Sequence, residues 1–241
     1  MQSGNSGLDY LWRYRLLSEH GGTADFEYEV VATSDLAAPV RARIMALFRE
    51  SYRDANEAYL ELALTKLRFI ATASSAGTIT GFALGEMRIM DLPGIPQQTV
   101  AMAGICCVDA SLRRHGLFRE LEGRAFMASG VAPGPRVLTC GRMAHPASFR
   151  VMTNFPTRVP QRNIRPTPWQ QEVGAIIAQA YGVHGFDPET FVCIGSGTPI
   201  GYPRIDIDVR PEEWDVFAQV NRDRGDSLLG LCWLPDAPPG W

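Results

Sequence analysis

One stretch of the sequence, residues 103–126, constrains the fold more than any other. It reads AGICCVDASLRRHGLFRELEGRAF: an apolar strand ending at Val108, a polar turn with Arg113 and Arg114, then Gly116 and an amphipathic helix. Glycine lets the backbone approach a ligand closely, and the first turn of a helix offers unpaired N–H groups at the positive end of its dipole. Two arginines add bidentate donors. This order predicts a binding site for an anion such as a pyrophosphate.

The composition is that of an ordinary globular protein and excludes several classes. Of 241 residues, 46% are hydrophobic and 20% are charged, with a net charge of −3, which excludes a disordered chain and a strongly basic nucleic-acid-binding surface. The five cysteines include no C-x-x-C pair and the four histidines are scattered, so we expect neither a disulfide framework nor a metal site. The apolar runs are shorter than the roughly 20 residues that span a bilayer, and the N-terminus lacks a signal-peptide pattern. We therefore expect a cytoplasmic protein.

Hydrophobic periodicity predicts a mixed α/β fold. An antiparallel run of strands comes first, and a strand–helix–strand unit follows. Asp35 is expected to cap the first helix, and the segment DLPGIPQQ, residues 91–98, to form a turn-rich loop. The predicted strands are 26–33, 68–74, 78–90, 99–108, 136–143, 191–194, 205–209 and 228–234, and the predicted helices are one after Asp35 and those at 56–67, 116–129, 144–153, 166–181 and 211–221.

The segment VDASLRRHGLF, from Val108 to Phe118, resembles motif A of the GCN5-related N-acetyltransferases. In that family, a strand ending in Val leads through a short loop to Arg/Gln-x-x-Gly-x-Gly/Ala at the start of a helix. Arg113 falls on the Arg/Gln position and Gly116 on the glycine, whereas Phe118 departs from the usual small residue. The motif is moderately specific, and the competing interpretation of an Arg-rich turn before a helix is a solvated cap.

A second match follows the next predicted strand, in RMAHPASFRVMTNF. It is similar to the family's helix of the form Asn-x-x-Ser…Gly-Phe, with His145 at the Asn position and Ser148 on the Ser. The resemblance implies a central mixed, mostly antiparallel twisted sheet flanked by helices, with a C-terminal α/β extension. The implied divisions are an N-terminal segment 1–25, an acyl-CoA-binding core 26–155, and an extension 156–241 packed on the same domain.

The family resemblance implies an acyltransferase that moves an acetyl or other acyl group from acyl-CoA, without a metal, to the amine of a small-molecule acceptor. The cofactor arm would pair with Ile105–Val108, and the amine would attack directly in a ternary complex. Glycine inside a strand often marks a bulge, and a bulge at Gly104 would free the N–H of Ile105 or Cys106 for the thioester carbonyl. The competing interpretation of Gly104 is a glycine required only for close packing. The residues expected to bind the cofactor are Ile105, Cys106, Val108, Arg113, Arg114, His115, Gly116, Leu117, Phe118 and Ser148.

Proton transfer is the task for which the sequence departs from the family. Many members carry a Tyr on the helix after the fifth strand, where this chain has Phe149 and Met152. Glu86 is a candidate base, with an ion pair to Arg88 as the competing interpretation. His145 has a suitable ordinary pKa, with a backbone or cofactor contact at the helix start as the alternative. The catalytic candidates are Glu86, Cys106 and His145, with Tyr181, Tyr202 or a water chain as further routes for a proton.

Other functions stay open at this stage. Cys106 and Cys107 face opposite sides of a strand, and a cysteine in an apolar strand usually behaves as a small hydrophobe, so a thiol nucleophile is disfavoured. The missing Tyr leaves room for O-acylation, for a non-transfer reaction, or for a non-catalytic module that binds acyl-CoA. Neither a nucleic acid nor a membrane is expected as a partner, and a homodimer is left open.

The extension after Phe155 is longer than a final hairpin needs. No Gly/Ser-rich or charged linker precedes it, so we expect it to pack on the body and to narrow the acceptor cleft. Tyr10, Trp12 and Tyr14 are expected to dock the N-terminus. For most of the aromatic residues taken singly, the favoured alternative is that they only fill a core. The extension's residues considered for shaping the pocket are Trp169, Tyr181, His184, Tyr202, Arg204, Trp214 and Trp233.

Overall fold

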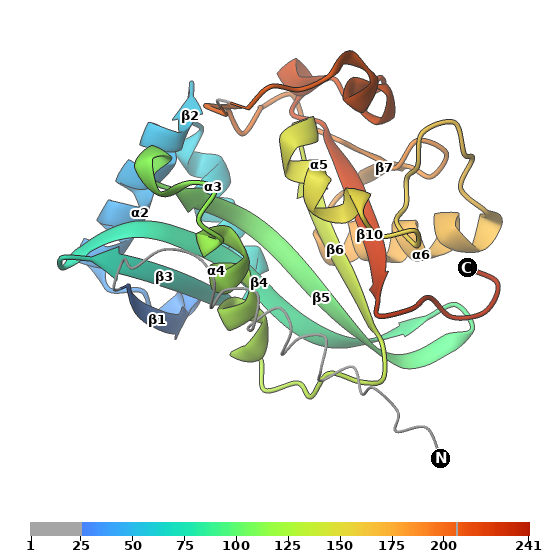
Figure 1. The fold of residues 1–241 in the computed structure, drawn as a ribbon, viewed down its shortest axis with the longest axis horizontal. Helices are drawn as coiled ribbons and strands as arrows, with labels where there is room; N and C mark the ends of the chain where they lie inside the picture. The colour runs from blue at the N-terminus through green and yellow to red at the C-terminus, as the bar shows by residue number, and fades with distance from the viewer. Residues whose placement is uncertain (1–25, 206) are drawn as a thin grey trace.

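One sheet of eight strands organises the computed structural model, which describes residues 26–205 and 207–241. The order across the sheet is β1-β3-β4-β5-β6-β10-β8-β7, and only β5 and β6 run parallel (Figure 1). The predicted mixed, mostly antiparallel sheet flanked by helices is confirmed. The segment 1–25, with Tyr10, Trp12 and Tyr14, lies outside the described residues.

The first half of the sheet is an antiparallel run joined by tight turns. Ala76 and Gly77 both have positive φ in the first hairpin, as the short connection demands. The predicted loop 91–98 is wrong, because Pro93 and Gly94 alone turn the chain and both strands continue up to them. The strands of this half are β1 (Glu27–Ala32), β3 (Phe69–Ser75), β4 (Thr78–Leu92) and β5 (Ile95–Val108).

The second half begins with the strand–helix–strand unit and is completed by the extension. Helix α4 (Leu117–Met127) connects β5 to β6 (Val137–Met143). The extension then adds β10 (Ser227–Leu234) directly beside β6, paired from Leu228/Met143 to Leu234/Val137. Two short strands, β8 (Val192–Ile194) and β7 (Gly185–Asp187), form the far edge.

Helices cover both faces of the sheet (Figure 1). On one face, Ile70, Phe82 and Leu84 pack with α2 and α3 in the main apolar core, which also includes buried residues of α6. On the other face, Ala71 and Ala83 pack against α4 in a smaller cluster, and α5 lies over β6 and β10. The bounds of these helices are α2 (Ala38–Ser51), α3 (Glu57–Lys66), α5 (Pro146–Thr153) and α6 (Pro168–Ala180).

Three local predictions need correction. Asp35 lies in a short 3-10 turn (Thr33–Asp35), and α2 starts after Ala37 with a proline in its first turn, where a backbone N–H is not needed. The predicted strand 205–209 is absent, since Ile205 and residues 207–209 lie in no strand. Instead, β9 (Tyr202–Pro203) pairs with β2 (Tyr52–Arg53) just before it. An alternating pattern makes no strand when no partner backbone lies alongside.

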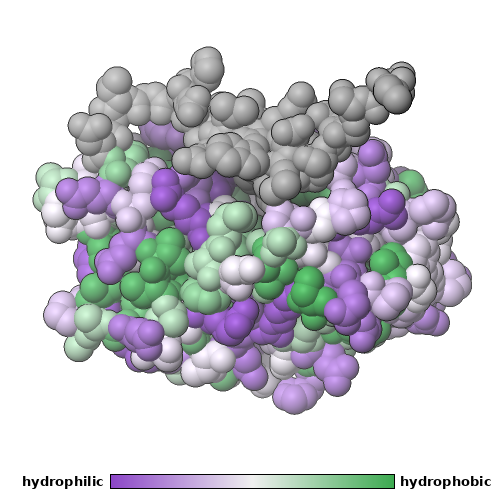
Figure 2. Space-filling model, turned by 90° about the horizontal axis from the view of Figure 1, so that it is seen from below, coloured by the Kyte–Doolittle hydropathy of each residue, from purple (hydrophilic) through white to green (hydrophobic). Residues whose placement is uncertain are grey.

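The last predicted helix is a 3-10 helix, η3 (Pro211–Phe217), and is shorter than expected. Within the described ranges, no helix is long and apolar enough to cross a membrane. The same part of the chain contains no group of three His, Cys, Asp or Glu side chains that could hold a metal ion. The surface seen in Figure 2 mixes hydrophilic and hydrophobic residues.

Candidate functional site

Strands β5 and β6 separate part-way along their length and leave a fork in the sheet. They pair from Thr99/Val137 as far as Ala103/Gly141, and no pairing follows. Beyond Ala103, β5 continues to Val108, and the two ribbons diverge in Figure 1. The edge of β5 from Gly104 to Val108 therefore faces a gap in the sheet instead of a neighbouring strand.

A bulge lies on β5 directly after the point of separation. Ala103 pairs with Gly85 and Cys106 with Ala83, so β5 has one residue more than β4 in this interval. Gly104 is required here, because a Cβ would lie 2.5 Å from Leu67 Cδ1 and 2.8 Å from Leu84 Cβ. The predicted bulge is confirmed. A bulge disrupts the ladder locally and leaves the extra residue unpaired.

Tyr181, at the end of α6, reaches the fork from the extension. Its hydroxyl lies 2.8 Å from the carbonyl oxygen of Ala103 on β5 and 3.0 Å from that of Cys140 on β6. Both carbonyls accept at the place where the β5–β6 pairing ends, so Tyr181 joins the two strands there. Burial raises the pKa of this phenol well above its usual value, so the hydroxyl keeps its proton.

The predicted anion-binding turn connects β5 to α4. The Asp109 carboxylate accepts hydrogen bonds from the hydroxyl of Ser111 at 2.6 Å and from its backbone N–H at 2.9 Å, and these two bonds, in that order, lower the pKa of the Asp109 carboxyl. Gly116 precedes α4 with φ of 80°, and open space surrounds its Cα where a side chain would point. Arg114 also has a positive φ, of 72°. Alternating conformations of this kind turn successive N–H groups toward one side and form anion-binding concavities.

Arg113 has a structural task in addition to its charge. Its Nε donates to the Val108 carbonyl at 3.1 Å, and its guanidinium also donates to the carbonyl of Arg204 in the extension. The side chain therefore holds the end of β5, the turn and the extension together. Residue Arg204 lies 91 positions away in the sequence, so only the tertiary structure shows this contact.

A cleft of about 1410 Å³ contains the fork, the bulge and the turn. Tyr59 and Lys66 line it from α3, and Glu122 and Phe126 line it from α4. These helices cover opposite faces of the sheet, so the cleft passes through the sheet at the fork. The cofactor-binding predictions that line the cleft are Ile105, Cys106, Val108, Arg113, Arg114, Gly116, Leu117, Phe118 and Ser148. His115 does not line it.

Glu86 is held by arginines and does not line the cleft. Its side chain is completely buried, and its two carboxylate oxygens accept from Arg68 Nε and Arg88 Nε, each at 2.6 Å. The ion pair with Arg88 that competes with the catalytic interpretation is therefore present, and Arg68 adds a second one. This placement removes the geometric basis for Glu86 as general base.

His145 lines the cleft but is engaged at the start of α5. Its Nδ1 accepts a hydrogen bond from the backbone N–H of Ala147 at 3.2 Å, and its ring lies edge-on to Trp214. Burial, together with the positive charges of Arg222 and Arg150, lowers the pKa of His145. A neutral imidazole that caps a helix fits the alternative interpretation of this residue.

The adjacent thiols behave as buried hydrophobes. Burial raises the pKa of Cys107 to about 12 and that of Cys106 well above the usual cysteine value. The charge of Glu122 on α4 raises the pKa of Cys106 further, whereas a hydrogen bond with Ser51 at the end of α2 lowers that of Cys107. The two side chains therefore face opposite sides of the sheet. All five cysteines of the chain are free.

Most of the extension's aromatic side chains fill the core and do not line the cleft. Trp169 and Trp233 both pack edge-on against Trp241. Of the seven extension residues that the sequence suggested, Tyr181 and Arg204 line the cleft. The sequence missed Glu122, although one signal was available. This glutamate lies beside Leu121 and Ala125 in the buried stripe of α4, where an apolar residue is expected.

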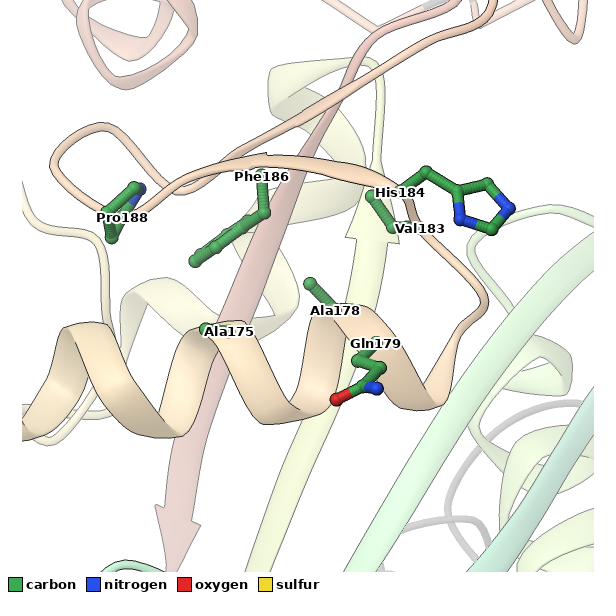
Figure 3. A pocket seen from close by; sticks show the side chains of 7 residues that line it. All are labelled: Ala175, Ala178, Gln179, Val183, His184, Phe186 and Pro188. Carbon is green, nitrogen blue, oxygen red and sulfur yellow. The ribbon is translucent and has the colours of Figure 1, made fainter.

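A smaller pocket of about 430 Å³ lies between α6 and the segment that leads to β7. Figure 3 shows Phe186 above Ala175 and Ala178 of α6, whereas the ring of His184 points away from the other labelled side chains. Nothing in this pocket resembles the fork, since its walls are mainly apolar side chains.

No protein-family model and no curated protein sequence matches the chain. Solved structures do match, with TM-scores near 0.37. The aminoglycoside N-acetyltransferase AAC(6')-Iy in complex with CoA is 16% identical, with a TM-score of 0.37, over 55% of this chain and 88% of that one. The GNAT family N-acetyltransferase YhbS from Escherichia coli, also with CoA, is 20% identical, with a TM-score of 0.38, over 57% of this chain and 73% of that one.

A third match is the GCN5-related glucosamine N-acetyltransferase region of a fungal multi-domain β-N-acetylglucosaminidase. It is 16% identical, with a TM-score of 0.36. The match covers 49% of this chain and 14% of that one. All three are described as N-acetyltransferases. The acceptors and the CoA named for them belong to those proteins.

Proposed function

We propose that this chain is an acyltransferase of the GCN5-related type, which moves an acyl group from acyl-CoA to the amine of a small molecule. The observation that carries the proposal is the continuity of the fork, the bulge and the glycine turn within one cleft. Each of these features meets one need of the cofactor. The turn suits a pyrophosphate, the free edge of β5 suits an arm with two amides, and the bulge suits a polarised thioester carbonyl.

The charge of the cleft also favours a polyanion such as coenzyme A. Seven cationic side chains line it against three carboxyl groups, in addition to His145. A cleft lined by one sign of charge concentrates ligands of the opposite sign. The cations are Lys66, Arg113, Arg114, Arg119, Arg124, Arg142 and Arg204, and the carboxyl groups are Glu120, Glu122 and Asp226.

Within this proposal, the cofactor arm takes the place that β6 vacates beside Gly104–Val108. The N–H of Ile105 or Cys106, at the bulge, would hydrogen-bond the thioester oxygen as negative charge develops on it. The acceptor would enter from the opposite side of the sheet, between Tyr59 and Lys66 on α3 and the end of α6. Both reactants then meet at the fork.

Binding is tested by thermal unfolding with coenzyme A and acetyl-CoA, and turnover by release of free thiol from acetyl-CoA with a panel of small amines. Saturation at 100 times the dissociation constant should stabilise the protein by about 2.7 kcal/mol. Gly116→Asp should abolish the shift, because it places a carboxylate against the phosphates. Gly77→Asp is the matched control, since Gly77 also has positive φ and open space but lies in a remote hairpin. The proposal fails if the wild type shows no shift at millimolar cofactor.

A further inference from the structure

Glu122 is a buried carboxyl group that the structure leaves without a polar partner. It lies on α4 and is 8% exposed. Of the three carboxyl groups that line the cleft, Glu120 pairs with Arg124 and Asp226 pairs with Arg224. Among the described residues, no hydrogen bond or ion pair is formed by the Glu122 carboxylate. The Glu122 oxygens are not among the fully buried atoms that lack a partner, so in this mostly buried residue the carboxyl group keeps access to the cleft, where a ligand can reach it.

The groups that face Glu122 place it at the fork. Burial is the main reason for the raised pKa of the Cys106 thiol on β5, and the charge of Glu122 raises it further. Burial also dominates the raised pKa of the Tyr181 hydroxyl, to which Glu122 adds the last of several smaller contributions. Cys106 belongs to the bulge, and Tyr181 bridges the last paired carbonyls of β5 and β6. Arg119, on the same helix, is the charged neighbour that favours the carboxylate. Glu122 therefore faces the part of the cleft where the proposed thioester would lie.

Burial outweighs Arg119 and raises the pKa of Glu122 to about 8. At neutral pH the group is therefore mostly a carboxylic acid with an O–H to donate. A thiol has an ordinary pKa of about 8.5, and proton transfer is efficient when the pKa of the acid lies near the working pH. Acid and leaving group are thus well matched.

Building on the proposed acyl transfer, we propose that Glu122 is the catalytic acid that protonates the sulfur of coenzyme A as it leaves. The amine nitrogen forms a bond to the thioester carbon, and the C–S bond breaks with its electron pair on sulfur. The Glu122 O–H proton moves to that sulfur, which yields the free thiol and a carboxylate. The nitrogen, now part of an amide, gives up one proton, which restores the carboxylic acid directly or through water. Atoms and charges balance, and no further reactant is needed.

The test compares kcat against pH for the wild type, Glu122→Gln and Glu122→Asp, with saturating acetyl-CoA and the fastest amine of the panel. We expect the wild-type kcat to fall at high pH with an apparent pKa near 8, and this fall is the high-pH limb of the profile. Glu122→Gln should lower kcat by about 10²-fold and lose this limb, with an unchanged thermal shift by coenzyme A. Glu122→Asp should keep the limb at a reduced rate. Glu120→Gln is the matched control on the same helix, and the limb should persist in it whatever its effect on cofactor binding.

A second measurement does not depend on turnover. Infrared difference spectra of the wild type minus Glu122→Gln should show a protonated carboxyl band at pH 6 that disappears near pH 8. A glutamine variant with wild-type kcat and limb, or the absence of that band, would overturn the role of Glu122 alone. The proposed function would still stand in that case, because it fails only if the wild type itself neither binds coenzyme A nor releases thiol.

Discussion

Glu86 and Glu122 are both buried glutamates in the same sheet-and-helix body, yet their surroundings differ completely. Glu86 lies on β4 between two arginines and outside the cleft. Glu122 lies on α4, without such a partner, and faces the cleft. Burial alone therefore does not separate structure from function. A paired buried carboxylate holds elements together, whereas an unpaired one in a cleft is available for chemistry.

The largest expected effect concerns the pH dependence of stability at Glu122. In the unfolded chain its pKa is near 4.5, whereas in the folded protein it is about 8. At a pH between these two values, Glu122 has lost its proton in the unfolded chain but keeps it in the folded protein. The contribution of this group to the free energy of unfolding is therefore complete below about pH 4.5, and it is lost as pH rises through 8. Glu122→Gln should remove this loss and be more stable than the wild type at pH 9 by about 5 kcal/mol, since the pKa difference corresponds to about 1.4 kcal/mol for each unit. Denaturant unfolding at pH 5 and pH 9 measures the difference, and parallel curves for the two proteins would contradict it.

Glu86→Gln should lower the stability of the protein, whereas Glu122→Gln should raise it at high pH. It leaves Arg68 and Arg88 facing a neutral amide, and breaking a buried pair usually costs about 3–5 kcal/mol. The side chain of Arg68 is more than half exposed and that of Arg88 about one third exposed, so we expect a loss of about 2–3 kcal/mol. Denaturant unfolding at pH 7 tests this, and the high-pH limb of kcat should persist. Loss of that limb in a folded Glu86→Gln protein would reverse the roles assigned to the two glutamates.

Tyr181→Phe should have the smallest effect on stability, about 1 kcal/mol, because it removes one hydrogen bond shared between two carbonyls. Its effect on function sharpens the comparison, since the hydroxyl lies at the fork that Glu122 faces. If Tyr181 only joins the strands, the variant should keep the pH limb that depends on Glu122. A pH profile shifted as in Glu122→Gln would instead make the phenol part of the proton path.

The sequence predicted well those features that depend on neighbours along the chain. The strand–turn–helix unit around Gly116 has the predicted bounds within a few residues, because its apolar periodicity and its glycine act locally. The bulge at Gly104 was also predictable, since a glycine inside a strand often marks a bulge or a close backbone approach. Residues 205–209 show the limit of prediction from local pattern, because strand-like alternation does not indicate whether a partner strand is present.

What the sequence determined by itself is therefore the order of the elements, the turn before α4 and the residue types available to a site. The tertiary structure alone decided which of those residues meet. Tyr181 reaches a carbonyl 78 residues away, and Arg113 one that lies 91 residues away. The same folding gave Glu86 two arginine partners and left the Glu122 carboxyl facing the cleft. Pairing across such separations depends on packing of the whole sheet, whereas periodicity senses only the few residues around each position.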